Sequence, residues 1–190
     1  MSTVPPSRPF RFSREQYFRL GELGFFAGKR VERIRGEIRE MSPIGWPHIV
    51  GCRKTAELLL QVFAGVGWVY KADPLNLTDS DPEPDVAVIP GRFEDYATHP
   101  TTALLIVEVA DATIDYDTTT KAEVYAEAGI PDYWVLDLNA RQLIVFRDPA
   151  PLPAGLGATA YRTRILLTLA DIVSPLAAPN ATITVGDLLP

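Results

Sequence analysis

Apolar residues recur along the chain with two different spacings, which separate predicted helices from predicted strands. A spacing of three to four residues marks one face of a helix, whereas alternation or a short apolar run marks a strand. Helices are therefore predicted at residues 13–23, 47–63 and 118–128. Strands are predicted at 30–41, 67–77, 85–89, 103–109, 132–138 and 143–147, with peripheral strands at 161–169 and 181–185. This order predicts an α/β (α+β) protein with a mixed β-sheet flanked by helices.

Local signals set several boundaries of these elements. Ser13 and Gln16 have the spacing of a capping box, which satisfies two amide groups where a helix begins. Gly129 ends the third predicted helix. The alternating segment 30–41 contains Gly36 and predicts two short strands or one bulged strand. Residues 148–159 are rich in Pro, Ala and Gly and are expected to form a long loop.

Length and composition indicate one soluble domain. The chain has 190 residues, of which 47% are hydrophobic and 22% charged, as in ordinary globular proteins. We expect a single domain over 1–190, with a flexible tail at 1–12, a core at 13–147 and an extension at 148–190 that packs on it. One cysteine excludes an internal disulfide framework. Without an apolar signal segment or membrane span, a cytoplasmic protein is expected.

The net charge of −6 hides an asymmetry along the chain. Residues 1–40 contain nine basic and five acidic side chains, whereas residues 73–117 contain eleven acids and one base. A general nucleic-acid binder would be basic over its whole domain, so that class is disfavoured. The pattern fits a metal-binding centre with a phosphate-contacting edge, or simply a set of solvated acidic loops.

Two carboxylates occur where the pattern predicts buried strands. Glu108 interrupts the apolar run 103–109, and Asp85 begins the strand before it. A buried carboxylate needs an ionic partner or a metal ion. If the two strands are neighbours, their carboxylates can hold a hard divalent cation. Lys121 lies on the inner face of the next helix and could balance their charge, or it could form a purely structural ion pair with Glu108.

Several of these residues also match a known family. The matching segments are Glu32 to Met41, His48, Pro84-Asp85, Val107 to Val109, Asp117, Lys121 and Tyr125 to Asp137. Over residues 10–190 the chain resembles the Uma2-like family (domain of unknown function 820), of the PD-(D/E)xK restriction-endonuclease-like superfamily. The resemblance implies a restriction-endonuclease-like core with a divalent-metal site and with additional strands at both ends.

The resemblance assigns roles to the central residues. Asp85 and Glu108 would be metal ligands, and the carbonyl of Val109 a third. The lysine of the superfamily motif lies two residues after the acid, where this chain has Ala110, so Lys121 takes that role. The Ser-Pro-Ser turn common in the family is replaced here by residues 110–113, Ala-Asp-Ala-Thr.

Other residues receive accessory roles. Glu37 would reach the metal or its water, and Asp117 would lie nearby. His48 would contact phosphate or, as we favour, cap and pack its helix. The phosphate backbone would be contacted by the arginines Arg30, Arg33 and Arg35.

Three functions follow as hypotheses. The first is a Mg²⁺- or Mn²⁺-dependent endonuclease, a homodimer that cleaves phosphodiester bonds in DNA. The second is a catalytically weak or inactive nucleic-acid-binding or assembly module of the same fold. The third is a metallohydrolase for small phosphoesters, which needs no basic groove.

Four further side chains are predicted to be structural. Trp46, Trp68 and Trp134 lie beside apolar residues and are expected in the core. Cys52 is expected to face the core from its helix. It receives no catalytic role, because the sequence places no base beside it.

Overall fold

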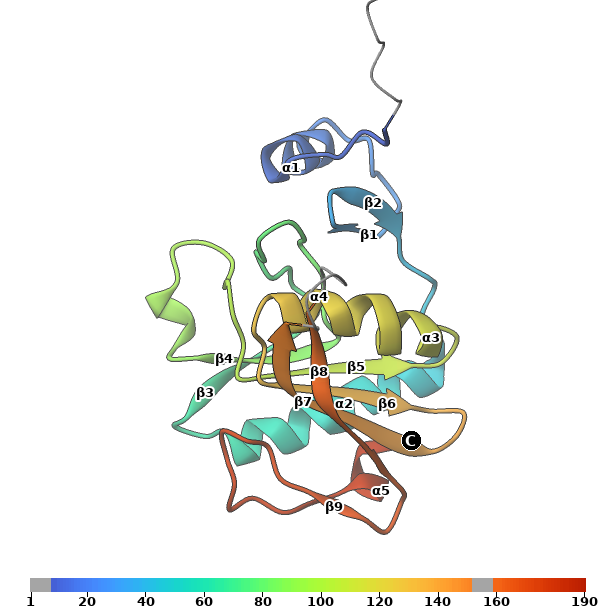
Figure 1. The fold of residues 1–190 in the computed structure, drawn as a ribbon, viewed down its shortest axis with the longest axis vertical. Helices are drawn as coiled ribbons and strands as arrows, with labels where there is room; N and C mark the ends of the chain where they lie inside the picture. The colour runs from blue at the N-terminus through green and yellow to red at the C-terminus, as the bar shows by residue number, and fades with distance from the viewer. Residues whose placement is uncertain (1–7, 152–158) are drawn as a thin grey trace, which may run out of the picture.

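A six-stranded sheet forms the centre of the computed structural model, which describes residues 8–151 and 159–190 (Figure 1). The strands follow in sequence order across the sheet. They are β3 (Gly67–Tyr70), β4 (Val86–Pro90), β5 (Leu105–Ala110), β6 (Asp132–Asp137), β7 (Gln142–Pro151) and β8 (Thr159–Leu167). β5 and β6 are parallel, and the other neighbours are antiparallel. This confirms the predicted mixed sheet.

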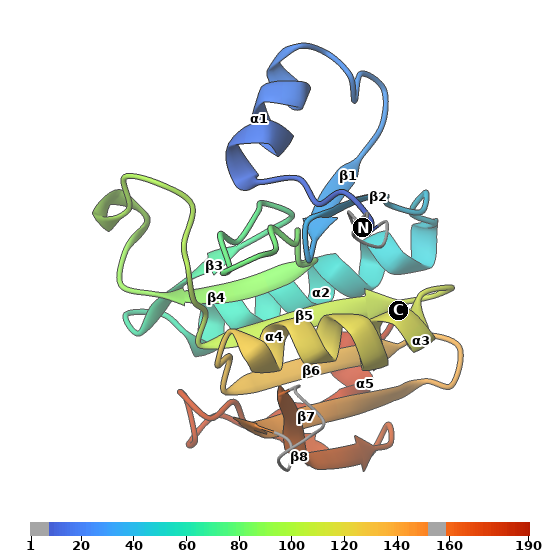
Figure 2. The same cartoon turned by 45° about the horizontal axis from the view of Figure 1, so that its top comes forward.

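Helices cover both faces of the sheet (Figure 2). On one face lies α2 (Trp46–Val62), packed on β3, β4 and β5 with the short α5 (Val185–Leu188) beside it. The crossover between β5 and β6 covers the other face. It is one continuous helical segment with three parts, α3 (Ile114–Tyr116), a π-helical turn η2 (Asp117–Lys121) and α4 (Ala122–Glu127).

The two faces of β5 explain why its sequence is apolar at every position except Glu108. Leu105, Val107 and Val109 pack into the layer under α2, whereas Ile106 and Ala110 pack into the layer under α4. Because successive strand residues point to opposite faces, a strand that is covered on both sides is apolar throughout. Glu108 therefore points to the α4 side, among buried residues.

The N-terminal elements form a separate layer above one end of the sheet (Figure 1). They are α1 (Arg14–Glu22) and a hairpin of β1 (Val31–Ile34) and β2 (Glu37–Glu40). The capping box of Ser13 and Gln16 is confirmed. The hairpin, one of the two forms predicted for 30–41, turns at Arg35 and Gly36, whose φ angles of 49° and 76° suit the twist of a two-residue turn.

Asp81 connects these N-terminal elements to the rest of the chain. Its two carboxylate oxygens accept hydrogen bonds from the Nε atoms of Arg14 and Arg33, each at 2.6 Å. The Asp81 side chain is 0% exposed and that of Arg33 only 5%. One carboxylate thus ties α1 and β1 to the segment that leads into β4.

Several predicted boundaries differ from the structure. β3 ends at Tyr70, although a strand was predicted to 77. The helical crossover begins at Ile114 instead of 118. β7 and β8 extend into the predicted loop 148–159, of which 152–158 lie outside the described residues. The last predicted strand shrinks to β10 (Ile183–Thr184), which pairs with β9 (Ile172–Val173).

The N-terminal segment was predicted to be a flexible tail over residues 1–12. Of the predicted tail, 1–7 lies outside the described residues, whereas Phe12 donates its backbone N–H to the carbonyl of Gly36.

Trp134 is buried as predicted, but Trp46 and Trp68 are 74% and 45% exposed, so the core prediction was wrong for them. Trp46 begins a helix and Trp68 lies on an edge strand, where apolar neighbours in sequence do not guarantee burial. In the described ranges, every helix falls short of the length and apolar character needed to cross a membrane.

We expect Asp81→Ala to lower the free energy of unfolding by about 3–5 kcal/mol, because the substitution leaves Arg33 buried without a counter-charge. Urea unfolding followed by circular dichroism measures this change. The control is Glu94→Ala, which removes the exposed partner of Arg92 and is expected to leave stability unchanged. Equal effects of the two substitutions would contradict the assigned role of Asp81.

Candidate metal and phosphodiester site

A cavity of about 410 Å³ opens where β4 begins and β5 ends, between the sheet and the N-terminal hairpin. Asp85 directly precedes β4, and Glu108 lies in β5 next to Val107, which pairs with Val86. The backbone N–H of Asp85 donates to Glu108 Oε2 at 3.2 Å, and the N–H of Val109 donates to Asp85 Oδ2 at 2.8 Å. Antiparallel pairing of these two strands therefore brings both carboxylates to the cavity wall.

A buried cluster of charges lies behind this wall. Lys121 Nζ is 3.0 Å from Glu108 Oε1 and 2.8 Å from Glu32 Oε2, and these three side chains are at most 5% exposed. The hydroxyl of Tyr125 donates to Glu108 Oε1 at 2.6 Å. One ammonium group thus serves two buried carboxylates, with Asp85 close by.

Burial, more than the neighbouring charges, governs the protonation of Glu108. Burial raises the pKa of Glu108 to about 8, and Asp85 and Asp117 add to the rise, although Lys121 opposes it. Burial by itself would lower the pKa of Lys121, but Glu108 and Glu32 hold it well above its ordinary value. Lys121 is therefore charged, and the cluster carries more negative charge than it can neutralise. A proton or a metal cation would complete the balance.

The π-helical turn brings Lys121 to this position. A π turn inserts one additional residue into a helix and is commonly found at functional sites. Here the turn spans Asp117–Lys121, and the carbonyl of Asp117 accepts a hydrogen bond from the hydroxyl of Tyr133 at 2.8 Å. The Asp117 carboxylate accepts from Thr113 Oγ1 at 2.5 Å and lines the cavity, and burial raises its pKa to about 6.

His48 contacts Asp85 from the first turn of α2. His48 Nε2 lies 3.2 Å from Asp85 Oδ2, and the imidazole lines the cavity with 13% of its side chain exposed. Burial lowers the pKa of His48, but the hydrogen bond and charge of Asp85 outweigh that and raise it. Gly45 occupies the N-cap of α2 and no side chain caps the helix there, so the capping part of the favoured interpretation of His48 was wrong. A packing role does not explain its contact with Asp85.

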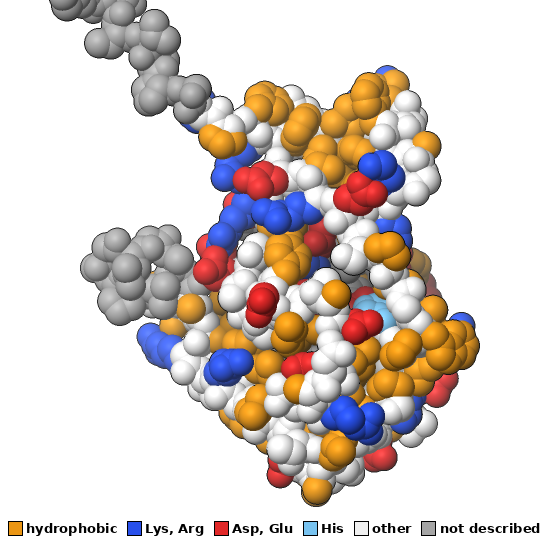
Figure 3. All heavy atoms as spheres, turned by 90° about the vertical axis from the view of Figure 1, so that its right-hand side faces the viewer, with side chains coloured by type: hydrophobic (Ala, Val, Ile, Leu, Met, Phe, Trp, Pro, Cys, Tyr) orange, Lys and Arg blue, Asp and Glu red, His pale blue; other side chains and the backbone are white. Residues whose placement is uncertain are grey.

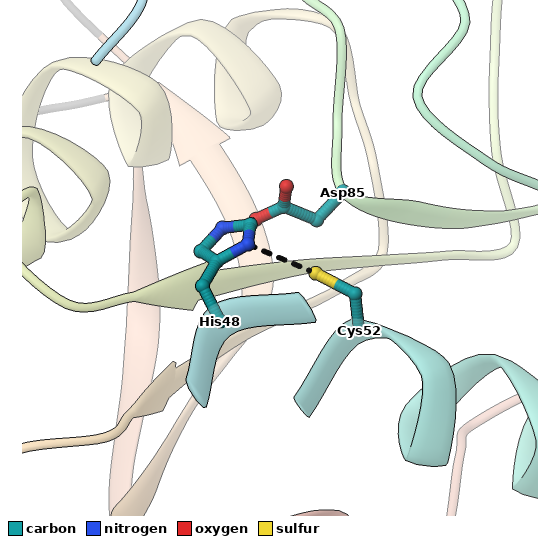
Figure 4. Close-up of side chains that lie close together, drawn as sticks. All are labelled: His48, Cys52 and Asp85. Atoms are coloured by element: carbon teal, nitrogen blue, oxygen red, sulfur yellow. Dashed lines mark hydrogen bonds and ion pairs between the residues drawn. The ribbon is translucent and has the colours of Figure 1, made fainter. Parts of the chain in front are cut away.

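Cys52 lies one turn further along α2, at the back of the same wall. Its Sγ atom is 3.4 Å from His48 Nδ1 (Figure 4), so the expectation that no base lies beside Cys52 was wrong. Burial raises the pKa of the Cys52 thiol well above its ordinary value, and the carboxylates of Asp85 and Glu108 add to this. Cys52 is consequently a neutral thiol rather than an activated nucleophile.

Glu32 occupies the position that the sequence had assigned to Glu37. Glu37 lies beside the hairpin turn, is 43% exposed, and pairs with Arg11 and Arg39 rather than with the cavity. The open end of the hairpin faces the cavity, and Glu32 belongs to that end. Alternation puts Glu32 on the same strand face as Ile34, which is 2% exposed, but all four residues of β1 are buried, so alternation alone does not single out Glu32.

The structure also redistributes the predicted phosphate-contacting arginines. Arg33 is buried against Asp81, and Arg35 pairs with Glu123 and Glu127, and neither arginine lines the cavity. Arg30 lines the cavity, is 44% exposed and lies 3.2 Å from Glu83. Arg39 lines the cavity as well and lies 3.2 Å from Glu37. Figure 3 shows basic and acidic side chains gathered in a hollowed band below the N-terminal elements.

The donor set fits a hard divalent cation. Asp85 and Glu108 supply oxygen ligands at one cavity wall, and Val109 lines the same wall. The hydrogen bonds from His48 and from the backbone of Val109 both reach Asp85 Oδ2, which leaves Oδ1 turned to other partners such as a metal ion. Oxygen donors with surplus negative charge are what Mg²⁺ and Mn²⁺ require.

Comparisons with known proteins bear on the family and the fold of this chain. The model of the Uma2 family, described as "Putative restriction endonuclease", matches residues 14–186. A solved structure, titled as a putative nuclease belonging to DUF820 from Anabaena variabilis ATCC 29413, has the same fold with a TM-score of 0.73. The two chains are 14% identical over 95% of this chain and 97% of that one. A search of the curated proteins gives no match.

We expect Lys121→Met to lower the free energy of unfolding by about 3–5 kcal/mol in the presence of a chelator, since it leaves Glu32 and Glu108 buried without a cation. Adding Glu32→Gln removes a buried carboxylate that Lys121 no longer neutralises, so the double variant should be more stable than Lys121→Met alone. Urea unfolding of all four combinations gives the coupling energy. Strictly additive effects would show that Lys121 and Glu32 are not paired in solution.

Proposed function

Because the chain belongs to the Uma2 family, we propose that it is a divalent-metal-dependent nuclease that hydrolyses phosphodiester bonds in DNA. The observation that carries this proposal is the position of Asp85 and Glu108 on one cavity wall, with the buried Lys121 bonded to Glu108. Surplus buried negative charge next to an accessible carboxylate favours a cation at this wall.

The ion we propose is Mg²⁺ or Mn²⁺, held by Asp85 and Glu108 with the Val109 carbonyl as a possible third ligand. When bound, such an ion lowers the pKa of a water molecule and polarises the phosphate. The protein groups keep the ligands in place. Tyr125 and Lys121 hold Glu108 Oε1, while the backbone N–H of Val109 and the ring of His48 hold Asp85 Oδ2.

Lys121 is the group we propose to assist the reaction. Its ammonium group has three N–H donors, of which Glu32 and Glu108 take two. The third can orient the attacking water or stabilise the negative charge that develops on the phosphate. Because two carboxylates fix the ammonium, this help requires no reorganisation when the reaction occurs.

Residues at the rim of the cavity would make the contacts to DNA. Arg30 and Arg39 line the same cavity as the carboxylates and can contact phosphate groups. A net charge of −6 makes long-range attraction to DNA weak, so affinity should come from these local contacts. A homodimer would present two such cavities to the two strands of a duplex. The homodimer itself is a prediction from the sequence.

The cavity also fits the smaller substrates of one alternative function. A volume of about 410 Å³ is in the range of small-molecule sites. A phosphoester hydrolase that acts on small diesters would use the same carboxylates and the same lysine. Comparing substrates separates the two functions.

We expect purified protein to cleave DNA with Mg²⁺ or Mn²⁺, and Asp85→Asn and Glu108→Gln to reduce the rate by about 100-fold or more. Calorimetry should show Mn²⁺ binding that is lost in both variants. The control is Glu94→Gln, an exposed carboxylate outside the cavity, which should keep the wild-type rate. Cleavage of a chromogenic diester but not of DNA would favour the small-phosphoester enzyme. DNA binding without cleavage would favour the non-catalytic module.

DNA binding should weaken steeply with salt, because phosphate contacts release counterions. Measured in the Glu108→Gln background to prevent cleavage, Arg39→Ala is expected to reduce the slope of log affinity against log salt by about 1. Arg162→Ala is the control, since this exposed arginine on β8 lies outside the cavity lining. An unchanged slope in Arg39→Ala would remove Arg39 from the interface.

A further inference from the structure

A second set of metal-binding side chains lies beside Asp85, on the face of α2 that packs against the sheet. His48 and Cys52 are four residues apart, which puts them on one side of the helix. His48 Nδ1 is 3.4 Å from Cys52 Sγ, and His48 Nε2 is 3.2 Å from Asp85 Oδ2. Figure 4 shows the three side chains directed toward one another, and one ligand atom from each lies within 4.8 Å of the other two.

We propose that His48, Cys52 and Asp85 form a binding site for a transition-metal ion of the Zn²⁺ class. This site differs from the Asp85–Glu108 pair in its ligand chemistry, and the two share the Asp85 carboxylate. The proposal goes beyond the nuclease function and does not depend on it.

The donor atoms select this class of metal. Thiolate and imidazole ligands favour Zn²⁺ and Co²⁺, whereas Mg²⁺ requires oxygen ligands and is reluctant to lose its water. Sulfur and nitrogen ligands on a tetrahedral zinc ion are about 3.5 Å apart, given bond lengths of about 2.3 and 2.05 Å. The 3.4 Å separation of Cys52 Sγ and His48 Nδ1 is close to that distance. The pair is thus already spaced for one ion.

The close packing of α2 on β5 brings these ligands to Asp85. A Cβ atom at Gly51, between His48 and Cys52, would lie 3.1 Å from Val109 Cγ1. Because residue 51 is glycine, α2 can approach β5 closely. Asp85 directly precedes β4, the strand that pairs with β5, so this approach also brings the helix close to Asp85. A larger residue at this position would push the helix, and both of its ligands, away from the sheet.

An ion can reach the site from the cavity. His48, Cys52 and Asp85 are each only partly buried, and His48 and Asp85 line the cavity. When the ion binds, Cys52 releases its thiol proton to solvent and its sulfur forms the metal bond. Three protein ligands leave one position of a tetrahedral ion for water, as in zinc sites that are not purely structural.

Sharing Asp85 makes the two sites compete. A Zn²⁺ ion on His48, Cys52 and Asp85 occupies the carboxylate that the Mg²⁺ site needs. Zn²⁺ should therefore displace Mn²⁺ from the wild-type protein, and Cys52 should set the strength of this displacement. The ion bound at Asp85 would then depend on the ratio of zinc to magnesium concentration, and Cys52 would be the residue that favours zinc.

The test is a Co²⁺ titration of the full chain, because a cobalt–thiolate bond gives a near-ultraviolet charge-transfer absorption that oxygen ligands do not give. We expect this band in the wild-type protein, its loss in Cys52→Ser, and at least about 100-fold weaker binding in His48→Gln. Glu108→Gln should keep the band, because Glu108 is not a ligand of this site. Circular dichroism and thermal unfolding show whether each variant is folded.

The outcomes distinguish this proposal from the nuclease function. No charge-transfer band at saturating Co²⁺ in the wild-type protein, or a band of unchanged affinity in His48→Gln, would overturn the proposed site. Mg²⁺-dependent cleavage could still be present in that case. The opposite result has two parts. A cobalt–thiolate band that one equivalent of Zn²⁺ abolishes would support the proposed site. If the same protein cleaves neither DNA nor a small diester, the nuclease proposal is refuted.

Discussion

The cost of burying more carboxylates than cations is the constraint on which the rest of this structure depends. Glu32 and Glu108 are both withdrawn from water and share one ammonium group, with Asp85 nearby. An unpaired buried charge costs several kcal/mol, so every element around the cluster has to supply a donor. The hydroxyl of Tyr125, the backbone amide of Asp85 and the Lys121 ammonium each donate to Glu108. The proposed metal completes this charge balance.

The N-terminal hairpin is part of this arrangement and not an accessory to it. It carries Glu32 to Lys121 and places Arg30 and Arg39 around the cavity. Its own position rests on Asp81, which binds Arg14 and Arg33 with both oxygens. Two ionic centres, one structural and one at the cavity, therefore hold the same hairpin in place.

The sequence predicted much of this from local physical patterns, and its errors have physical causes. Glu108 stood out because a carboxylate in an apolar strand needs a partner, and Asp85 because it begins the adjacent strand. Glu32 was missed because the hairpin offers three acids, Glu32, Glu37 and Glu40, and which of them reaches Lys121 is a tertiary fact. Arg33 was misassigned because a buried arginine and a phosphate-binding arginine look alike in sequence. The pairing of His48 with Asp85 depends on how closely α2 packs on β5, which periodicity cannot give.

The route by which Lys121 reaches Glu108 has a consequence for how this site can change. When lysine and acid are two residues apart on one strand, the pleat fixes their separation and no loop can alter it. Here Lys121 follows Glu108 by thirteen positions along the chain and is reached through a turn and a π-helical segment. A one-residue change in the 111–113 turn would rotate the helix by about 100° and move the ammonium group while leaving the β-ladder intact. The length of that turn therefore sets the position of the Lys121 ammonium group relative to Glu108. Evolution can change this position without changing the fold.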